Sequence, residues 1–256
     1  MGSFFTSYEN TTNSLIFHPP KTLPIEFNEL VVPKRSRFIS ELDIPCLLVH
    51  PETKKSATHC VIFSHGNGCD IYTMYKHILQ IADALGVDVL IYDYPGYGLA
   101  NLKPLSEKGC YESLTKVINW AKMRYYHHIT LIGHSLGTGV VMDHCATFDW
   151  RSTVFLLSPY KSMGRVVTDT AACSSIKSID KFGTYYKVDT IMCPVKIFHG
   201  TTDTLIDISH AKDLFESLRN QTYEPTWLEN VGHNDLLDVV IRDHMGEISK
   251  IMGLVH

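Results

Sequence analysis

The sequence predicts an α/β fold, in which a mostly parallel sheet of about eight strands carries helices on both faces. Two observations lead to this fold class. Short, β-branched and continuously apolar runs alternate along the chain with segments whose apolar residues recur at helical spacing. Continuous apolar character is expected of strands that are covered on both faces. The length of 256 residues and the 45% share of hydrophobic residues suffice for one large core.

The expected strands are apolar runs, taken here from the amino to the carboxyl end. They are residues 29–32, 44–49, 60–63, 89–92, 129–132, 153–157, 195–198 and 226–228. No helical pattern separates the first two runs, so we expect the sheet to begin with an antiparallel pair. A helical pattern or a longer insertion follows each of the third to seventh runs, which predicts parallel pairing for the remainder.

Five segments have apolar residues at helical spacing. They are residues 71–82, 111–121, 136–145, 208–218 and 236–251. Asp70 stands directly before the first of them and Asp207 before the fourth. A short acidic side chain at such a place accepts hydrogen bonds from the free N–H groups of the helix start. We therefore expect both aspartates to be N-caps.

The chain is organised as one domain preceded by an arm. Residues 1–24 are polar and contain three prolines, which predicts an N-terminal arm, and residues 25–256 form the α/β domain. The stretch 159–190, between the sixth and seventh strands, is irregular and too short for a large lid domain, so we expect a short cap. Candidates within it for lining a substrate pocket are Tyr160, Met163 and Val166.

Composition and charge exclude several classes of function. The formal net charge is −4 and no basic run is longer than Lys34–Arg37, so the chain lacks the positive footprint of a nucleic-acid-binding protein. The seven cysteines are odd in number and form no C-x-x-C pair, which is typical of free thiols in a reducing compartment. No histidine or cysteine cluster has the spacing of metal ligands, so we expect neither metal nor cofactor.

The N-terminal sequence determines whether contact of the protein with membranes is expected. It has no basic region followed by a long apolar run, and no apolar stretch reaches the roughly eighteen residues that span a bilayer. Gly2 and Thr6 match the pattern for N-myristoylation. A single myristoyl chain holds a protein at membranes only weakly, so we expect a cytoplasmic protein with at most peripheral membrane contact.

The pentapeptide Gly133-His134-Ser135-Leu136-Gly137 follows the fifth expected strand and begins the third expected helix. A serine at the apex of such a turn adopts a strained backbone, and side chains two residues before and after it would collide across the turn. This G-x-S-x-G pattern predicts a nucleophile elbow with Ser135 as the nucleophile. The alternative is that Ser135 only caps the helix.

A serine hydroxyl needs a base beside it, and the base needs an acid that fixes its tautomer. Asp203 follows the seventh expected strand, about 68 residues past Ser135, and His233 follows the eighth, about 30 residues further. Both would lie on loops at the carboxyl ends of strands, where parallel sheets bind their ligands. We predict His233 as the base and Asp203 as the acid, with Asp207 as the rival acid.

Acyl transfer also requires N–H donors for the oxyanion that forms. One is expected from the backbone of Leu136, at the start of the helix that follows the serine. The second is expected from the backbone of Asn67 in the His-Gly-Asn-Gly segment 65–68, with Gly66 as the alternative donor and as a substrate-binding residue. The turn 93–98 is expected to shape the pocket wall without chemistry of its own.

These segments stand in the order found in one family. From about residue 26 to the end, the sequence resembles the α/β-hydrolase superfamily, through His-Gly-Asn-Gly, Tyr-Asp-Tyr-Pro-Gly-Tyr-Gly, Gly-His-Ser-Leu-Gly, His-Gly-Thr-Thr-Asp and Gly-His-Asn-Asp. Residues 92–98, 199–203 and 232–235 are similar to those of alpha/beta-hydrolase domain-containing serine hydrolases that remove palmitate from cysteines of membrane-bound proteins. Those relatives carry an N-terminal cysteine cluster that holds them at membranes, whereas the first cysteine here is Cys46.

The sequence thus predicts a serine hydrolase. Ser135, His233 and Asp203 would form a catalytic triad that cleaves a carboxylic ester or thioester through an acyl-enzyme. The resemblance implies that the acyl group is apolar, on a small molecule or an acylated protein. Two alternatives remain open: a peptidase or amidase on the same triad, and a non-catalytic binding protein that has kept the fold.

Overall fold

The computed structural model of the protein describes residues 13, 16–21, 35–167 and 180–254. Gly2, most of the expected arm, the expected strand at 29–32 and part of the expected cap therefore lie outside the described residues. The boundary between arm and domain stays a prediction.

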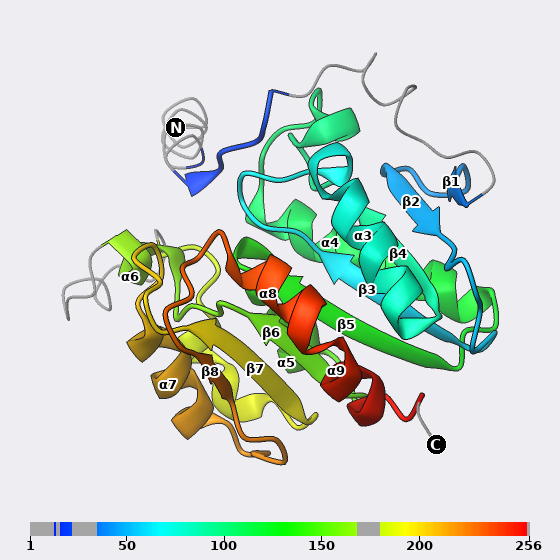
Figure 1. Cartoon of the computed structure of the whole chain (residues 1–256). Coiled ribbons are helices and arrows are strands. Elements are labelled where there is room, and N and C mark those ends of the chain that lie inside the picture. Colours follow the sequence, from blue (N-terminus) through cyan, green and yellow to red (C-terminus); the bar gives the residue numbers. More distant parts are fainter. Residues whose placement is uncertain (1–12, 14–15, 22–34, 168–179, 255–256) are drawn as a thin grey trace, which may run out of the picture.

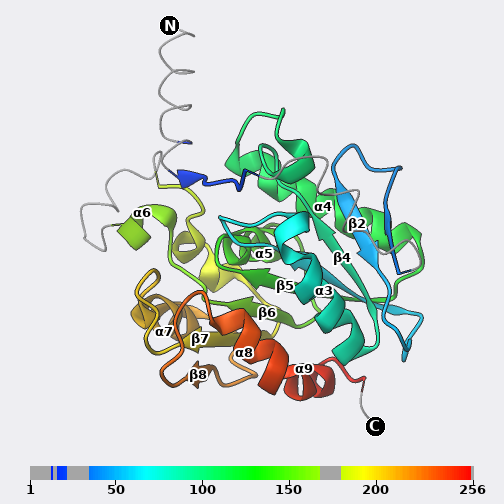
Figure 2. The same cartoon turned by 45° about the horizontal axis from the view of Figure 1, so that its top comes forward.

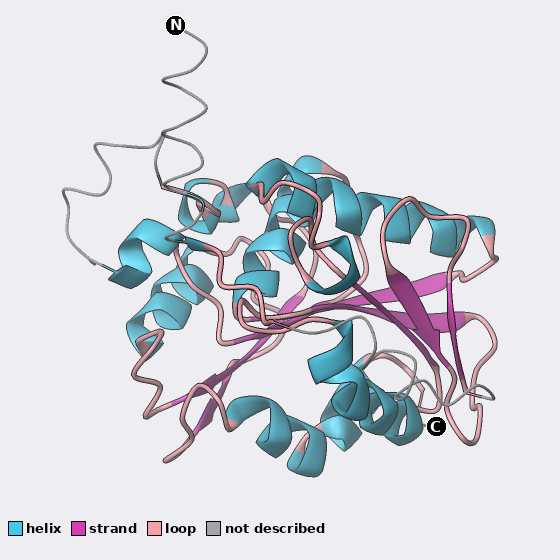
Figure 3. Ribbon diagram, turned by 90° about the horizontal axis from the view of Figure 1, so that it is seen from above, coloured by secondary structure: helices cyan, strands magenta, loops and turns pink. Residues whose placement is uncertain are grey.

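A central sheet of eight strands separates two layers of helices (Figure 1, Figure 3). The strands are β1 (Ser36–Phe38), β2 (Cys46–Val49), β3 (His59–Ser64), β4 (Asp88–Tyr92), β5 (His128–His134), β6 (Val154–Leu157), β7 (Val195–Gly200) and β8 (Thr226–Leu228). Their order is β1-β2-β4-β3-β5-β6-β7-β8. β2 pairs antiparallel with β1 and with β4, and every later pair is parallel. The predicted fold class is confirmed.

The edge strand β1 differs from the expectation. The sheet does begin with antiparallel strands, but the edge partner of β2 is Ser36–Phe38, which the sequence did not indicate. Arg37 and Phe38 in this strand are exposed and only Ser36 is buried. An edge strand of three residues with one buried position carries no apolar run, so its pattern cannot be told from that of a loop.

Helices cover the two faces of the sheet and supply separate cores (Figure 3). One face carries α3 (Ile71–Leu85), α8 (Leu236–Asp243) and α9 (Met245–Ile251), and the other carries α4 (Glu107–Met123), α5 (Leu136–Thr147) and α7 (Ile208–Ser217). β3 sends Cys60 and Ile62 into one core and Val61 and Phe63 into the other. Strands of this kind need apolar residues at every position, which explains the continuous runs in the sequence.

Both predicted N-caps are confirmed. The Asp70 carboxylate accepts a hydrogen bond from the Thr73 N–H at 2.8 Å, and the Thr73 hydroxyl bonds in return to the Asp70 backbone N–H, which completes a capping box. The Asp207 carboxylate accepts a hydrogen bond from the Ser209 N–H at 2.9 Å at the start of α7. These caps fix where α3 and α7 begin relative to the strands that precede them.

The single helix expected at 236–251 is wrong: the chain forms α8 and α9 with a break at His244. His244 has φ −120 and ψ 2, and its N–H closes α8 on the Val240 carbonyl. Val240 and Met245 both belong to the same core, although five residues on a straight helix turn through about 140° past a full circle. The break at His244 brings Met245 back to the core face.

The described part of the cap is small and contains α6 (Met163–Val167) and two 3₁₀ turns, η3 (Thr184–Tyr186) and η4 (Val188–Thr190). Another 3₁₀ turn, η1 (Gly98–Ala100), follows β4. Across the described residues, no helix is both long and apolar enough to cross a membrane. Within the same residues, no group of three or more histidine, cysteine or acidic side chains could hold a metal ion.

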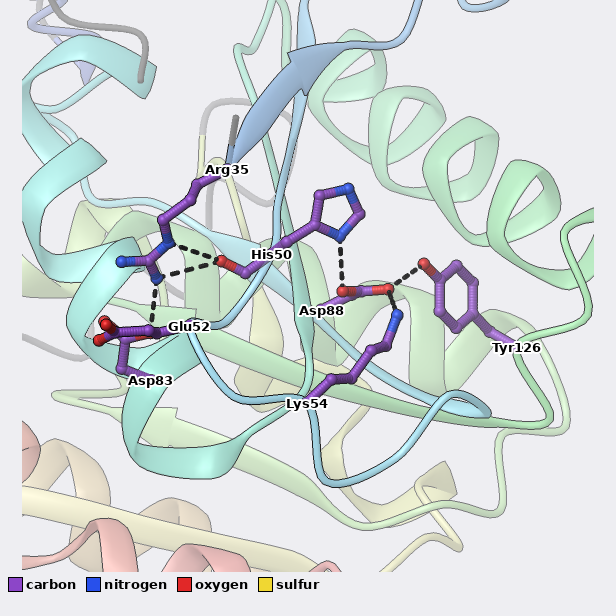
Figure 4. Close-up of polar contacts among 7 residues, drawn as sticks. All are labelled: Arg35, His50, Glu52, Lys54, Asp83, Asp88 and Tyr126. Carbon is purple, nitrogen blue, oxygen red and sulfur yellow. Dashed lines mark hydrogen bonds and ion pairs between the residues drawn. The ribbon is translucent and has the colours of Figure 1, made fainter. Parts of the chain in front are cut away.

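A buried carboxylate holds the amino end of the sheet, where Asp88 begins β4 (Figure 4). Its oxygens lie 2.8 Å from His50 Nδ1, 2.5 Å from Lys54 Nζ and 2.6 Å from the Tyr126 hydroxyl. Burial alone raises the pKa of Asp88, but the hydrogen bonds from Lys54, Tyr126 and His50 outweigh it and leave the pKa below its usual value. This ionised group ties the loop after β2 and the loop before β5 to β4.

Candidate active site

Ser135 stands at a strained turn between β5 and α5. Its backbone has φ 49 and ψ −117, in the left-handed half of the map that a residue with a side chain rarely occupies. Its side chain makes no capping hydrogen bond to α5, so the alternative of a simple helix cap is wrong. The turn presents the hydroxyl at the carboxyl edge of the sheet, as a nucleophile elbow does.

Two glycines make room for this turn. A Cβ on Gly133 would lie 2.7 Å from the Gly137 carbonyl oxygen, which is the collision across the turn that the sequence predicted. A Cβ on Gly137 would lie 2.0 Å from the carbonyl oxygen of Ser64. The second glycine is therefore required by the close approach of α5 to the end of β3.

Ser135, His233 and Asp203 lie in a hydrogen-bonded row. His233 Nε2 is 3.1 Å from Ser135 Oγ, and His233 Nδ1 is 2.7 Å from Asp203 Oδ2. The three residues come from the loops that follow β5, β8 and β7, so the topology gathers them at one edge of the sheet. This is the arrangement of nucleophile, base and orienting acid in which a serine hydroxyl can be activated.

The surroundings of Asp203 keep it ionised. Its side chain is buried, and Oδ1 accepts hydrogen bonds from the N–H groups of Leu205 at 3.0 Å and Ile206 at 2.8 Å. Burial raises the pKa of Asp203, but the hydrogen bond from His233, the bond from Ile206 and the nearby histidines together hold the pKa below its usual value. The rival acid, Asp207, instead caps α7, where its carboxylate accepts the Ser209 N–H.

The backbone groups expected to bind an oxyanion border the serine. Leu136 is the first residue of α5, so its N–H has no acceptor within the helix and lies at the positive end of the helix dipole. A Cβ on Gly66 would lie 3.5 Å from the Ser135 Cβ, which shows how closely the loop after β3 passes the nucleophile. Leu136, Gly66 and Asn67 all line the same cavity as Ser135.

The side chain of Asn67 ties this loop to the N-terminal segment, which the sequence did not indicate. Asn67 Oδ1 accepts hydrogen bonds from the His18 N–H at 2.8 Å and from the Tyr97 hydroxyl at 2.6 Å. Asn67 Nδ2 donates to the Ile16 carbonyl oxygen at 2.7 Å. The amide thus pairs with the backbone of residues 16–18 on one side and with the turn after β4 on the other.

Aromatic packing holds the same segment and loop in place. Phe17 is buried and meets Tyr97 and Phe182 edge to face, with ring centroids 6.3 Å and 5.8 Å apart. The Tyr94 hydroxyl donates to the His65 carbonyl oxygen at 2.9 Å. The turn 93–98 therefore holds the loop after β3 in position, which is a further role beside the expected one of shaping the pocket wall.

A cavity of about 510 Å³ opens beside Ser135 and His233. Four of its lining residues, Gly66, Tyr160, Met163 and Val166, were expected there. The predicted site residues Ser135, His233, Leu136 and Asn67 also line it, whereas the sequence did not indicate Ile16, His18, Cys69, Leu205 and Ile206. Figure 2 shows the segment 16–21, in blue, on the same side of the molecule as α6. The N-terminal segment and the cap thus enclose a mostly apolar space next to the serine.

His134, the residue before Ser135, lies against His233. The ring of His134 stacks on that of His233, with centroids 5.7 Å apart and planes inclined by 25°. Burial, and then the proximity of His233, lower the pKa of His134 to about 3. Burial therefore disfavours a charge on His134 next to the imidazole of His233.

Comparison with known proteins gives relatives for most of the chain. A family model described as the alpha/beta hydrolase family matches residues 61–231. The chain is 39% identical over 209 residues to the alpha/beta hydrolase L404 of Acanthamoeba polyphaga mimivirus, a match that covers 80% of this chain and 78% of that protein. It is 35% identical over 187 residues to alpha/beta hydrolase domain-containing protein 17B of Xenopus laevis, which covers 71% of this chain. The match spans 62% of that relative, less than two thirds of its length.

Solved structures share the fold at low sequence identity. The esterase Pf2001 of Pyrococcus furiosus superposes with a TM-score of 0.72 at 15% identity, over 92% of this chain and 98% of that chain. The monoacylglycerol lipase of Paleococcus ferrophilus superposes with a TM-score of 0.62 at 16% identity, over 84% of this chain and 100% of that chain. At these identities the likeness concerns the fold alone.

We expect Gly137→Ala to lower the free energy of unfolding by about 3 kcal/mol or more, because the added methyl group would meet the backbone of a buried strand that cannot move aside. Gly246→Ala is the matched control, since a Cβ there meets nothing within 4 Å and alanine is favoured over glycine in a helix. Urea unfolding of the two purified variants measures the difference. Equal stability of Gly137→Ala and the parent would contradict the close approach of α5 to β3.

Proposed function

Because the chain belongs to the alpha/beta hydrolase family, we propose that it is a serine hydrolase that cleaves carboxylic esters or thioesters. The observation that carries the proposal is the row from Ser135 through His233 to Asp203, with 3.1 Å and 2.7 Å between the interacting atoms. A serine needs such a row to act as a nucleophile at neutral pH.

In the proposed reaction, His233 Nε2 removes the proton from Ser135 Oγ as that oxygen attacks the acyl carbonyl carbon. The carbonyl electron pair moves to its oxygen, and the backbone N–H groups of Leu136 and Asn67 bind the resulting oxyanion. When the intermediate collapses, protonated His233 gives its proton to the departing alcohol or thiol and Ser135 is left acylated. Water then attacks the acyl-enzyme with His233 as the base, which releases the carboxylic acid and restores the serine.

Asp203 takes part through charge and orientation. It accepts the Nδ1–H of His233, which turns Nε2 toward Ser135, and its negative charge stabilises the imidazolium that forms during each half of the reaction. The low pKa of Asp203 supports this role, because the carboxylate then remains ionised throughout the range in which His233 works.

The cavity supports an apolar acyl group as the acid part of the substrate. Most of its lining beyond the serine is hydrocarbon, and Tyr160 and Met163 would contact the acyl chain. The finer form of the proposal is an acyl-protein thioesterase of the depalmitoylase type, which rests on the resemblance of the residues 92–98, 199–203 and 232–235. A peptidase or amidase would use the same row, and matched ester, thioester and amide substrates distinguish the three.

We propose a cytoplasmic location for the enzyme, with peripheral membrane contact through a lipidated Gly2 as the alternative. The odd number of cysteines and the lack of a C-x-x-C pair support a reducing compartment. Gly2 lies outside the described residues. Fractionation of cells that express the untagged chain tests the location, and recovery in the membrane pellet that is lost on Gly2→Ala would favour the alternative.

Ser135→Ala is expected to abolish turnover while the protein stays folded. The loss in kcat should be at least about a thousandfold, because nucleophile, base and acid act as one unit. A fluorophosphonate probe should label the parent and leave this variant unlabelled, and a panel of p-nitrophenyl esters measures the rate. Activity within tenfold of the parent, with the probe still attached, would sink the proposed function.

Asp203→Asn is expected to cost about 10⁴-fold in kcat, because an amide favours the wrong tautomer of His233 and cannot stabilise its cation. Asp207→Asn is the matched control, since asparagine caps a helix as well as aspartate does and should keep kcat within about threefold. Steady-state kinetics on both purified variants decide between them. If Asp207→Asn is the more damaging change, the proposed acid is wrong.

Met163→Trp is expected to shorten the acyl chains that the enzyme accepts, because the larger side chain fills part of the cavity. The kcat/KM for a decanoyl ester should fall at least about tenfold relative to that for an acetyl ester. Met123→Trp is the control, since Met123 is 71% exposed at the end of α4 and lies outside the cavity lining. An unchanged ratio in Met163→Trp would place the acyl chain elsewhere.

A further inference from the structure

The buried hydroxyl of Ser158, at the end of β6, contacts Asp203, which follows the neighbouring strand β7. Ser158 follows β6 directly and is completely buried. Its Oγ donates a hydrogen bond to Asp203 Oδ2 at 3.0 Å. The same oxygen lies 2.7 Å from His233 Nδ1, so the serine hydroxyl and the imidazole share one carboxylate oxygen.

The backbone at Ser158 is strained in a way that a serine does not favour. Its φ is 50, close to the φ of 49 at Ser135, and both residues stand at the ends of the adjacent parallel strands β5 and β6. The N–H of Ser158 is fixed by the Phe198 carbonyl oxygen at 3.0 Å, which ties it to β7, the strand that leads to Asp203. Glycine would adopt this φ without strain, but it would supply no hydroxyl.

We propose that Ser158 is a positioning residue of the row: its hydroxyl holds Asp203 Oδ2 in line with His233 and withdraws part of the carboxylate charge from the imidazole. The inference rests on the proposed serine hydrolase function. Two donors fill Oδ2, and the N–H groups of Leu205 and Ile206 bind Oδ1, so the carboxylate is fixed at both ends. Without the hydroxyl, His233 is the donor that remains on Oδ2, and the carboxylate is held less firmly in line with it.

The effect of removing the Ser158 hydroxyl on His233 has a predictable direction. A carboxylate that loses a hydrogen-bond donor concentrates more negative charge on the oxygen that faces His233. That charge favours the protonated imidazole, so the variant without the hydroxyl should become active only at a higher pH than the parent. The acid limb of the kcat/KM profile, which reports the free base, then moves to higher pH.

Three other titratable groups lie near Asp203 and His233. His199 Nε2 lies 3.5 Å from Asp203 Oδ2 and 2.9 Å from the Ile206 carbonyl oxygen, and burial lowers its pKa. His134 faces His233 from β5, and burial lowers its pKa to about 3. Asp207 lies farther along the loop, where the hydrogen bonds of Ser209 hold its pKa below the usual value. Burial thus disfavours the charged form of both histidines, and Asp207 stays ionised to lower pH than a free carboxyl group does.

Ser158→Gly and Ser158→Ala test the proposal together. Glycine removes the hydroxyl and relieves the backbone strain, whereas alanine removes the hydroxyl and keeps the strain. For both we expect kcat to fall about tenfold at unchanged KM, because the base is held less well in line. We also expect the acid limb of kcat/KM to rise by about half a pH unit. Ser113→Ala is the control: this buried hydroxyl donates to the Gly109 carbonyl oxygen within α4, so its loss should leave both quantities unchanged.

The outcomes separate the inference from the function on which it rests. A folded Ser158→Gly variant with the rate and pH profile of the parent would overturn the positioning role. A loss of rate with an unmoved acid limb would also overturn it, because the hydroxyl would then not act on His233 through the Asp203 carboxylate. If the parent has no activity that Ser135→Ala removes, the proposed function itself fails. Thermal unfolding of each variant confirms that the measured proteins are folded.

Discussion

A left-handed turn at Ser135 is the constraint on which the rest of the candidate site depends. The turn leaves no space for a side chain at Gly133, and the absence of a side chain at Gly137 lets α5 start directly against the end of β3. The same approach brings the first N–H of α5 beside the loop that follows β3. One short piece of backbone therefore places both the nucleophile and the proposed oxyanion donors, and the base and acid need only arrive from later loops at the same sheet edge.

The parts of the molecule that follow a repeating pattern could be predicted from the sequence. Strands such as β3 and β7 face a core on each side, so they appear as unbroken apolar runs, and the helices α3 and α4 between them each show an apolar stripe. Asp203 and His233 could be found for the same reason, since each comes directly after such a strand. The rule that parallel strands present their carboxyl ends together then brings them near Ser135.

The rest depends on contacts between residues far apart in the sequence. Ile16 and His18 meet Asn67 across about fifty residues, and no local pattern marks them. Ser158 reaches Asp203 across 45 residues through a hydroxyl that could equally face solvent. The break at His244 turns α9 so that Met245 faces the core again. An apolar pattern assessed over the sixteen residues 236–251 does not reveal a break at one residue.

The side chain of Asn67 joins the proposed oxyanion loop to the backbone of residues 16–18. These hydrogen bonds couple the N-terminal segment to the loop after β3. Coupling between binding events is reciprocal, so a ligand that orders the loop also strengthens the docking of the segment, and a force on the segment disturbs the loop. A change in the position of residues 16–18 would thus reach the loop that borders Ser135. We therefore expect that a tag, a lipid or a partner protein attached ahead of residue 16 would change turnover as well as location.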